Sequence, residues 1–140
     1  MKPSQTKQYQ AEASKKYRKM HPEKAMIDKE RMKERRPFYF WAATSIRNHR
    51  ANGCVIKLTI PELEQIASES KECAICGKCL KWNGGKGMLK DLPTVDRINN
   101  EDILSKDTIQ ILCFDCNRTK GYRSMQEFIA YCSLIVSKFS

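Results

Sequence analysis

The first third of the chain shows almost no pattern of buried positions. Between Lys7 and Arg35 the residues are mainly Lys, Glu, Arg, Met, Ala and Gln, which favour helix, and bulky apolar residues are sparse. Pro22 disfavours helical backbone angles at His21, and it is itself suited to the first turn of a new helix. The pattern therefore predicts two solvated helices that meet at His21.

Apolar positions at helical spacing begin after Pro37. They predict a helix that ends at Asn52-Gly53, with Arg47 and Arg50 on its outer face. Four aromatic residues in succession at the start of a helix cannot all stack on bases, so core packing is favoured over nucleic-acid stacking. The residues predicted to be buried on this helix are Phe38, Trp41, Ala42 and Ile46.

Short strands and helices alternate through the rest of the chain. Val55–Leu58 predicts a strand, and Thr59 then begins a helix with a capping box and one apolar face. Ser124 begins a second capping box, and the C-terminal helix that follows is predicted to cover the preceding unit. The residues predicted to form the buried stripe of that helix are Phe128, Ile129, Cys132, Ile135 and Val136.

Two Cys-x-x-Cys pairs are the strongest chemical signal in the sequence. A two-residue gap lets both thiolates of a pair reach one ion, and two such pairs complete the tetrahedral site that structural zinc prefers. The predicted zinc ligands are Cys73, Cys76, Cys113 and Cys116. Cys79 could replace Cys76, but Gly77 suits a tight turn directly after Cys76 and favours that residue. Cys54 and Cys132 are predicted to be small buried apolar residues.

The segment between the two cysteine pairs predicts a small zinc-clipped unit. Pro93–Ile98 and Thr108–Leu112 predict two strands joined by the polar loop Asn99–Lys106, and a helix is predicted from about Phe114. This order gives a ββα unit. The Gly-rich stretch Trp82–Gly87 matches neither a P-loop nor a dinucleotide fingerprint, so an ordinary turn is predicted there.

Asp96 on the first of these strands and Asn117 at the start of the helix could converge on one point. A carboxylate and an amide oxygen suit Mg²⁺ or Mn²⁺, which prefer oxygen ligands and keep waters that a phosphate can replace. A second metal site, separate from zinc, is therefore predicted.

These motifs together resemble the zinc-knuckle HNH endonucleases, especially the phage-type members with an Asp-Arg-Ile sequence. The resemblance covers roughly residues 54–123 and is carried by Val95-Asp96-Arg97-Ile98 and by Ile111-Leu112-Cys113-x-x-Cys116-Asn117-x-x-Lys120-Gly121. It implies that Asp96 and Asn117 hold the catalytic divalent ion and that Asp96→Ala abolishes cleavage with the fold intact.

The sequence departs from the family pattern at two positions. Arg97 stands where the family usually has a His general base, and Thr108, beside Asp107, stands where it has an Asn. An arginine keeps its proton, so Arg97 would act electrostatically on the scissile phosphate. The remaining candidates for the base are a metal-bound hydroxide, Asp102, Asp107, His21 and His49. His49, in Arg47-Asn48-His49-Arg50, is chemically the better histidine.

The positive charge is concentrated in the first part of the chain. Of the net charge of +10, residues 1–50 contribute +9, because they carry 14 of the 26 basic residues and 5 of the 16 acidic ones. Such an excess favours phosphate backbones, and too few bulky apolar residues accompany it for membrane insertion. The residues predicted to contact nucleic acid are Lys15, Lys16, Arg18, Lys19, Arg35, Arg36, Arg47, Arg50, Lys120 and Arg123.

The sequence as a whole predicts an α+β protein with a basic helical arm at residues 1–36 and a Cys₄ zinc-stapled ββα-metal nuclease domain at residues 37–140. Seven cysteines, with no signal peptide and no long apolar run, predict a reducing, cytoplasmic setting. The expected function is hydrolysis of DNA, double-stranded in the first instance, with structural Zn²⁺ and catalytic Mg²⁺ or Mn²⁺. The alternative is a non-catalytic zinc-containing DNA- or RNA-binding module in which Asp96 and Arg97 form an ion pair.

Overall fold

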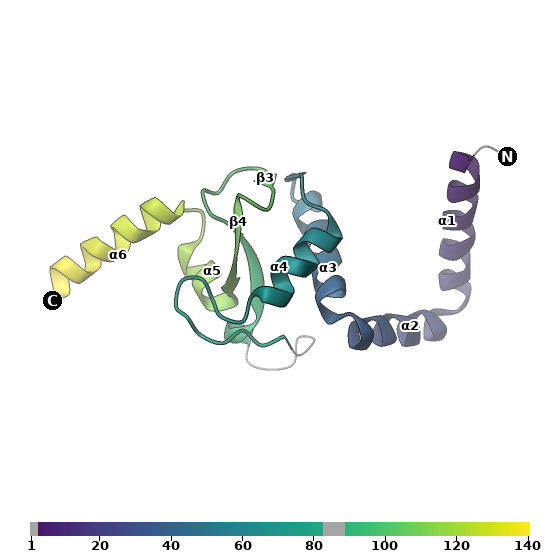
Figure 1. Ribbon diagram of the computed structural model, residues 1–140, viewed down its shortest axis with the longest axis horizontal. Helices are drawn as coiled ribbons and strands as arrows, with labels where there is room; N and C mark the ends of the chain where they lie inside the picture. The colour runs from purple at the N-terminus through teal and green to yellow at the C-terminus, as the bar shows by residue number, and fades with distance from the viewer. Residues whose placement is uncertain (1–2, 83–88) are drawn as a thin grey trace. The chain divides into compact units, whose positions relative to one another are not determined.

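The computed structural model describes residues 3–82 and 89–140, which form a mixture of helices and short strands (Figure 1). Two compact units are present, Met1–Arg35 and Arg36–Ser140, and their boundary lies one residue before the one predicted. Arg36 belongs to the second unit because its guanidinium binds Glu64 through Nε at 3.2 Å and Nη2 at 2.6 Å. The predicted turn at 82–87 lies outside the described residues except for Trp82.

The first unit consists of two helices with no apolar core. The predicted break at His21 is confirmed, since α1 spans Pro3–Met20 and α2 spans Pro22–Arg35. The rings of Tyr17 and His21 lie 4.6 Å apart at the junction. No side chain between residues 6 and 35 is buried, as expected for helices whose residues are mostly charged.

The second unit contains the remaining elements. Its helices are α3 (Pro37–Ala51), α4 (Ile60–Glu69), α5 (Phe114–Lys120) and α6 (Met125–Phe139), with a 3-10 turn, η1, at Leu89–Asp91. Its strands are β1 (Val55–Ile56), β2 (Pro93–Arg97), β3 (Ile103–Leu104) and β4 (Ile109–Cys113). None of the described helices is both long enough and apolar enough to cross a membrane.

The core of the second unit forms where α3 and α4 meet the strands. Ala42 and Ile46 of α3 are buried as predicted, while Trp41 is half-buried and its ring centroid lies 5.0 Å from that of Trp82. The capping box at Thr59 is present, with the Glu62 carboxylate accepting from the Thr59 N–H at 2.8 Å. The contacts of Trp41, Ala42 and Ile46 hold α3 against the rest of this unit.

Two small sheets support the site. β2 and β4 pair antiparallel, with Asp96 opposite Gln110, and α5 follows β4 directly, in the order that the sequence predicts. β3 interrupts the segment predicted to be a polar loop, and it pairs in parallel with β1 so that Val55 lies opposite Ile103. Leu104 is fully buried by this pairing. Two apolar residues in a polar segment give no alternation of apolar and polar positions, so the sequence predicts no strand there. These residues form a strand because they pair with the distant strand β1.

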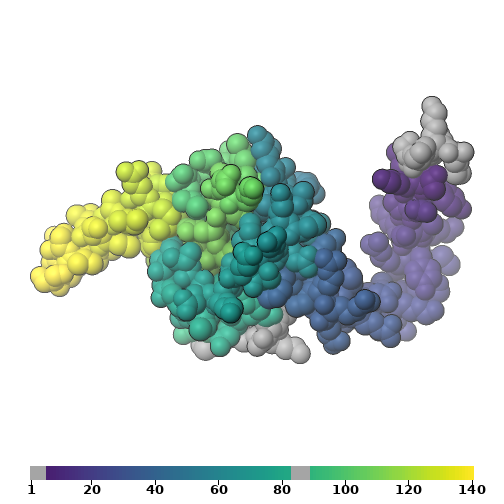
Figure 2. Space-filling view, viewed as in Figure 1, coloured from purple at the N-terminus to yellow at the C-terminus, as the bar shows by residue number. Residues whose placement is uncertain are grey.

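The predicted burial of α6 is wrong for most of its stripe. Phe128 is buried, but Ile129, Ile135 and Val136 are 57%, 42% and 62% exposed. Cys132 is exposed as well, whereas Cys54 is buried as predicted. The side chains of residues 129–140, in yellow, lie on the surface in Figure 2. Helical periodicity identifies an apolar face and does not say what covers it.

Candidate functional site

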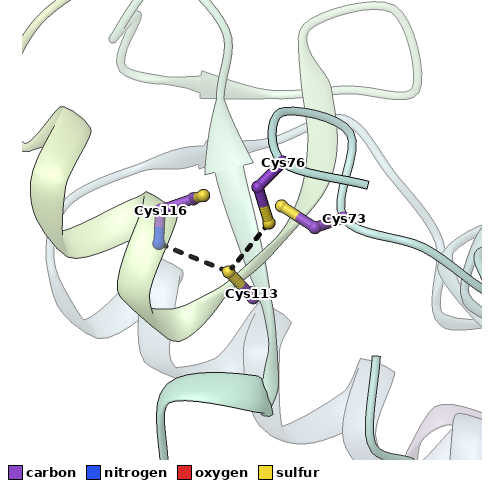
Figure 3. A group of neighbouring side chains, drawn as sticks. All are labelled: Cys73, Cys76, Cys113 and Cys116. Carbon is purple, nitrogen blue, oxygen red and sulfur yellow. Dashed lines mark hydrogen bonds between the residues drawn. The ribbon is translucent and has the colours of Figure 1, made fainter. Parts of the chain in front are cut away.

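The four predicted zinc ligands come together in one cluster. The Sγ atoms of Cys73, Cys76, Cys113 and Cys116 all lie within 4.8 Å of one another. The Sγ atoms of Cys76 and Cys113 are 3.8 Å apart, which is about the edge of a tetrahedron with Zn–S bonds near 2.3 Å. Figure 3 shows the four side chains converging from two places, the turn that carries Cys73 and Cys76 and the corner between β4 and α5. The donor set therefore suits a tetrahedral ion such as Zn²⁺.

Local turns explain how each pair reaches the centre. A bridge between Glu72 and Cys79 closes the first turn, and Gly77 there has a positive φ of 71°. Cys79 is exposed and lies outside the cluster, so Cys76 is the residue that joins the other three. Cys113 ends β4 and caps α5, because its sulfur accepts from the Cys116 N–H at 3.4 Å.

The thiols of the cluster are electrostatically interdependent. Burial raises the pKa of Cys113 and Cys116, and the neighbouring sulfurs raise the pKa of Cys116 further. Burial acts in the same direction at Cys73, but hydrogen bonds from the backbone N–H groups of Cys76, Cys113 and Ile75 lower its pKa to about 7. Adjoining thiolates repel one another, so several negative charges persist here only beside a cation. A bound Zn²⁺ would supply that cation and tie the first turn to α5.

A cavity of about 380 Å³ lies beside this corner. Asp96 of β2 and Asn117 of α5 both line it, so the two residues predicted to hold a divalent ion face one space. Asn117 follows Cys116 directly, and the cysteine cluster thereby fixes the helix turn that carries it. The full lining is His49, Val95, Asp96, Arg97, Asn100, Asn117, Arg118, Gly121 and Tyr122.

Asp96 is paired with a buried lysine. The Asp96 carboxylate is 5% exposed, and its Oδ1 lies 3.1 Å from Nζ of Lys120, which is fully buried. Its Oδ2 accepts from Nε2 of Gln110 at 2.9 Å, and Lys120 also donates to the Arg97 carbonyl at 2.9 Å. The prediction that Lys120 contacts phosphate is therefore wrong. Lys120 lies nearly one turn after Asn117, on the face of α5 that packs against β2.

The Asn117 amide is oriented by a hydrogen-bond chain. The Thr94 hydroxyl donates to the Leu112 carbonyl at 2.9 Å, so Thr94 Oγ1 can only accept from Asn117 Nδ2, also at 2.9 Å. With its nitrogen committed to Thr94, Asn117 has its Oδ1 left as an acceptor at the cavity. This is the atom that a divalent ion would use.

Arg97 is held by the loop that follows β2. It donates to the Glu101 carbonyl at 2.8 Å and, more distantly, to the Asn100 and Asp102 side chains, each at 3.4 Å. The alternative ion pair between Asp96 and Arg97 is therefore wrong, because each residue has another partner. The side chain of Asp102 is 92% exposed, and neither Asp102 nor Asp107 lines the cavity. The structure therefore does not support either carboxylate as the general base.

His49 reaches the cavity from α3, an element outside the motif. Its Nδ1 lies 2.7 Å from the carbonyl of Ser45, and because a carbonyl only accepts, Nδ1 carries the hydrogen. In the neutral ring Nε2 is then the acceptor. His21 belongs to the other compact unit. The sequence identifies His49 as a residue that can act as a base, but no pattern in it indicates that α3 lies beside β2.

The predicted nucleic-acid contacts have different environments. Those exposed to solvent are Lys15, Lys16, Arg18, Lys19, Arg35, Arg36, Arg47 and Arg50. Arg36 is committed to Glu64, and the guanidinium of Arg123 lies 4.4 Å from the centre of the Tyr131 ring. Arg118 is exposed and lines the cavity, and sequence reasoning missed it. Its position directly after Asn117 was the available signal.

Comparisons with family models, curated proteins and solved structures found no match. Functional inference therefore depends on the chemistry of the cysteine cluster and of the cavity beside it.

Proposed function

We propose that this protein is a divalent-metal-dependent endonuclease of the HNH type that hydrolyses phosphodiester bonds in DNA. The observation that carries the proposal is the meeting of Asp96, Asn117 and His49 around one cavity, beside the cysteine cluster. These residues come from three separate elements, and each brings a group suited to the reaction. The sequence resemblance to HNH endonucleases gives independent support.

Asp96 and Asn117 are the residues proposed to hold Mg²⁺ or Mn²⁺. A carboxylate has about four lone-pair positions, and Lys120 and Gln110 occupy two of those on Asp96. Asn117 offers Oδ1, because its nitrogen is committed to Thr94. When bound, the ion supplies positive charge beside the scissile phosphate.

The arginines of the cavity supply the contacts to phosphate. Arg97 and Arg118 both line the cavity, and a guanidinium keeps its charge at any relevant pH. The exposed basic residues of α1 and α2 belong to a separate unit, where contacts to phosphates add affinity without sequence preference. Duplex DNA is the proposed substrate.

Cleavage should depend on Asn117. We expect the zinc-loaded protein to nick supercoiled DNA with Mg²⁺ or Mn²⁺ but not with EDTA, and Asn117→Ala to slow nicking by roughly 100-fold or more, because one of two protein ligands is lost. The matched control is Asn48→Ala, at an exposed position on α3, with cleavage unchanged. Unaltered nicking by Asn117→Ala would show that the proposed ion site is wrong.

His49 is the proposed general base. Its Nε2 can take a proton from the attacking water while Nδ1 stays bonded to Ser45. His49→Ala should lower the cleavage rate by about 10²- to 10⁴-fold, the usual contribution of a positioned base, and added imidazole should restore part of it. His21→Ala is the control and should cleave normally. A His49→Ala protein with full activity would leave a metal-bound hydroxide as the base.

A non-catalytic nucleic-acid-binding module is the second candidate. It is favoured by one observation, that the charge of Asp96 is already balanced by Lys120 inside the protein. Both functions predict binding that weakens with salt, so binding alone does not separate them. Binding to supercoiled and branched DNA without turnover in Mg²⁺ or Mn²⁺ would establish this second function.

A further inference from the structure

Helix α6 carries a broad apolar face with almost no cover in the described part of the chain. Ile129, Val136 and Phe139 are 57%, 62% and 82% exposed, and every residue from 129 to 140 is exposed. Soluble monomers rarely leave contiguous apolar patches larger than a few hundred Å² open to water. Only Phe128, in the first part of the helix, is buried.

Apart from Ala130 and Leu134, the apolar residues of α6 fall on one side of the helix. At about 100° per residue they occupy an arc of roughly 160°, and Cys132 lies near its centre. The members of this arc are Met125, Phe128, Ile129, Tyr131, Cys132, Ile135, Val136 and Phe139. Gln126, Ser133 and Ser137 lie on the opposite side. The face therefore has the width of a helix that packs against another surface.

The charges of α6 indicate what that surface is. The helix has only two charged residues, Glu127 and Lys138, and because they are eleven residues apart they lie on the same flank of the apolar face. When two identical helices pack antiparallel, the same flank of each helix meets. Glu127 of one copy would then face Lys138 of the other, at both ends of the pair. Glu127 uses Oε2 in the capping box with Ser124, which leaves Oε1 for this contact.

We propose that α6 pairs antiparallel with α6 of a second copy of this chain. A parallel pair would place Glu127 and Lys138 opposite the uncharged flank, where neither has a partner. A helix lying on a membrane surface typically carries several Lys or Arg on its polar face, and α6 has one. The point midway between Glu127 and Lys138 falls between Cys132 and Ser133, which brings the two Cys132 side chains close to the two-fold axis.

Sedimentation of the zinc-loaded full chain tests the pairing. We expect a concentration-dependent dimer, and we expect Ile135→Glu to shift it to monomer, because the change puts a carboxylate inside the apolar face. The matched control is Leu134→Glu, on the Glu127 side of the helix, which should leave the dimer intact. A wild-type protein that stays monomeric, or a dimer that Ile135→Glu does not weaken, would overturn the proposal.

A short bis-maleimide cross-linker tests the register of the pair, because an antiparallel pair centred between Cys132 and Ser133 brings the two Cys132 side chains together. Cross-linked dimer should form through Cys132, disappear in Cys132→Ser and persist in Cys79→Ser, since Cys79 is also exposed but lies outside α6. A dimer that cannot be cross-linked through Cys132 would overturn the pairing centred at this residue. Neither measurement uses DNA cleavage, so its outcome is independent of the proposed nuclease activity.

Discussion

Replacing Cys113 with Ser is expected to unfold the unit formed by residues 36–140. The side chain is 1% exposed, and its sulfur belongs to the cysteine cluster while also capping the N-terminus of α5. Structural zinc contributes about 10–16 kcal/mol in small sites at neutral pH, which is comparable to the whole net stability of about 5–15 kcal/mol of a typical domain. Loss of one ligand therefore removes a large share of the folding free energy.

Circular dichroism and bound-zinc content measure this effect. Cys113→Ser should lose both its zinc and its cooperative thermal transition, and chelation of wild-type protein should do the same until Zn²⁺ is restored. Cys79→Ser and Cys132→Ser are controls, because both residues are exposed and outside the cluster. Cooperative unfolding of Cys113→Ser at the wild-type temperature would show that the cluster has no structural metal.

The second large effect concerns Asp96. Asp96→Ala should destabilise the protein by about 3–5 kcal/mol, because it leaves the buried ammonium of Lys120 without its ion pair. Lys120→Met in the same chain should recover much of that loss, since it removes the uncompensated charge. Urea unfolding of wild type, the two single variants and the double variant gives the coupling between the two residues.

Asp102→Ala is the matched control for Asp96→Ala. Asp102 also pairs with a cation, Arg97, but its side chain is 92% exposed, so its loss should cost at most about 1 kcal/mol. If Asp96→Ala costs no more than Asp102→Ala, the buried pair contributes little to stability.

The expectation from sequence that Asp96→Ala leaves the fold intact does not fit the contacts. Asn117→Ala is the cleaner test of metal binding, because the one hydrogen bond of its side-chain nitrogen within the described residues is to the hydroxyl of Thr94.

The spacing of residues along the sequence was sufficient to predict the features that depend on residues close together in the chain. The helix break at His21, the capping box at Thr59 and the strand–strand–helix order around Cys113 are present where the sequence placed them. The same holds for the choice of Cys76 over Cys79, since a two-residue gap and a following glycine fix the turn.

Most of the features that sequence reasoning missed depend on distant contacts. β3 became a strand because β1 lies beside it, and Lys120 became a partner of Asp96 because its face of α5 packs on β2. The position of Lys120 near Asn117 predicts a phosphate contact, whereas its burial depends on a counter-charge, Asp96, that lies 24 residues away.

Apart from β3, the sequence by itself determined the main elements, the four-cysteine cluster and the chemical types of the site residues, because helical period, capping and ligand spacing are local properties. Tertiary structure alone decided that His49 joins Asp96 and Asn117 around one cavity. It also decided that the apolar face of α6 remains exposed. Both outcomes depend on which surfaces meet after the elements form, and a periodic pattern specifies the face of an element without specifying its partner.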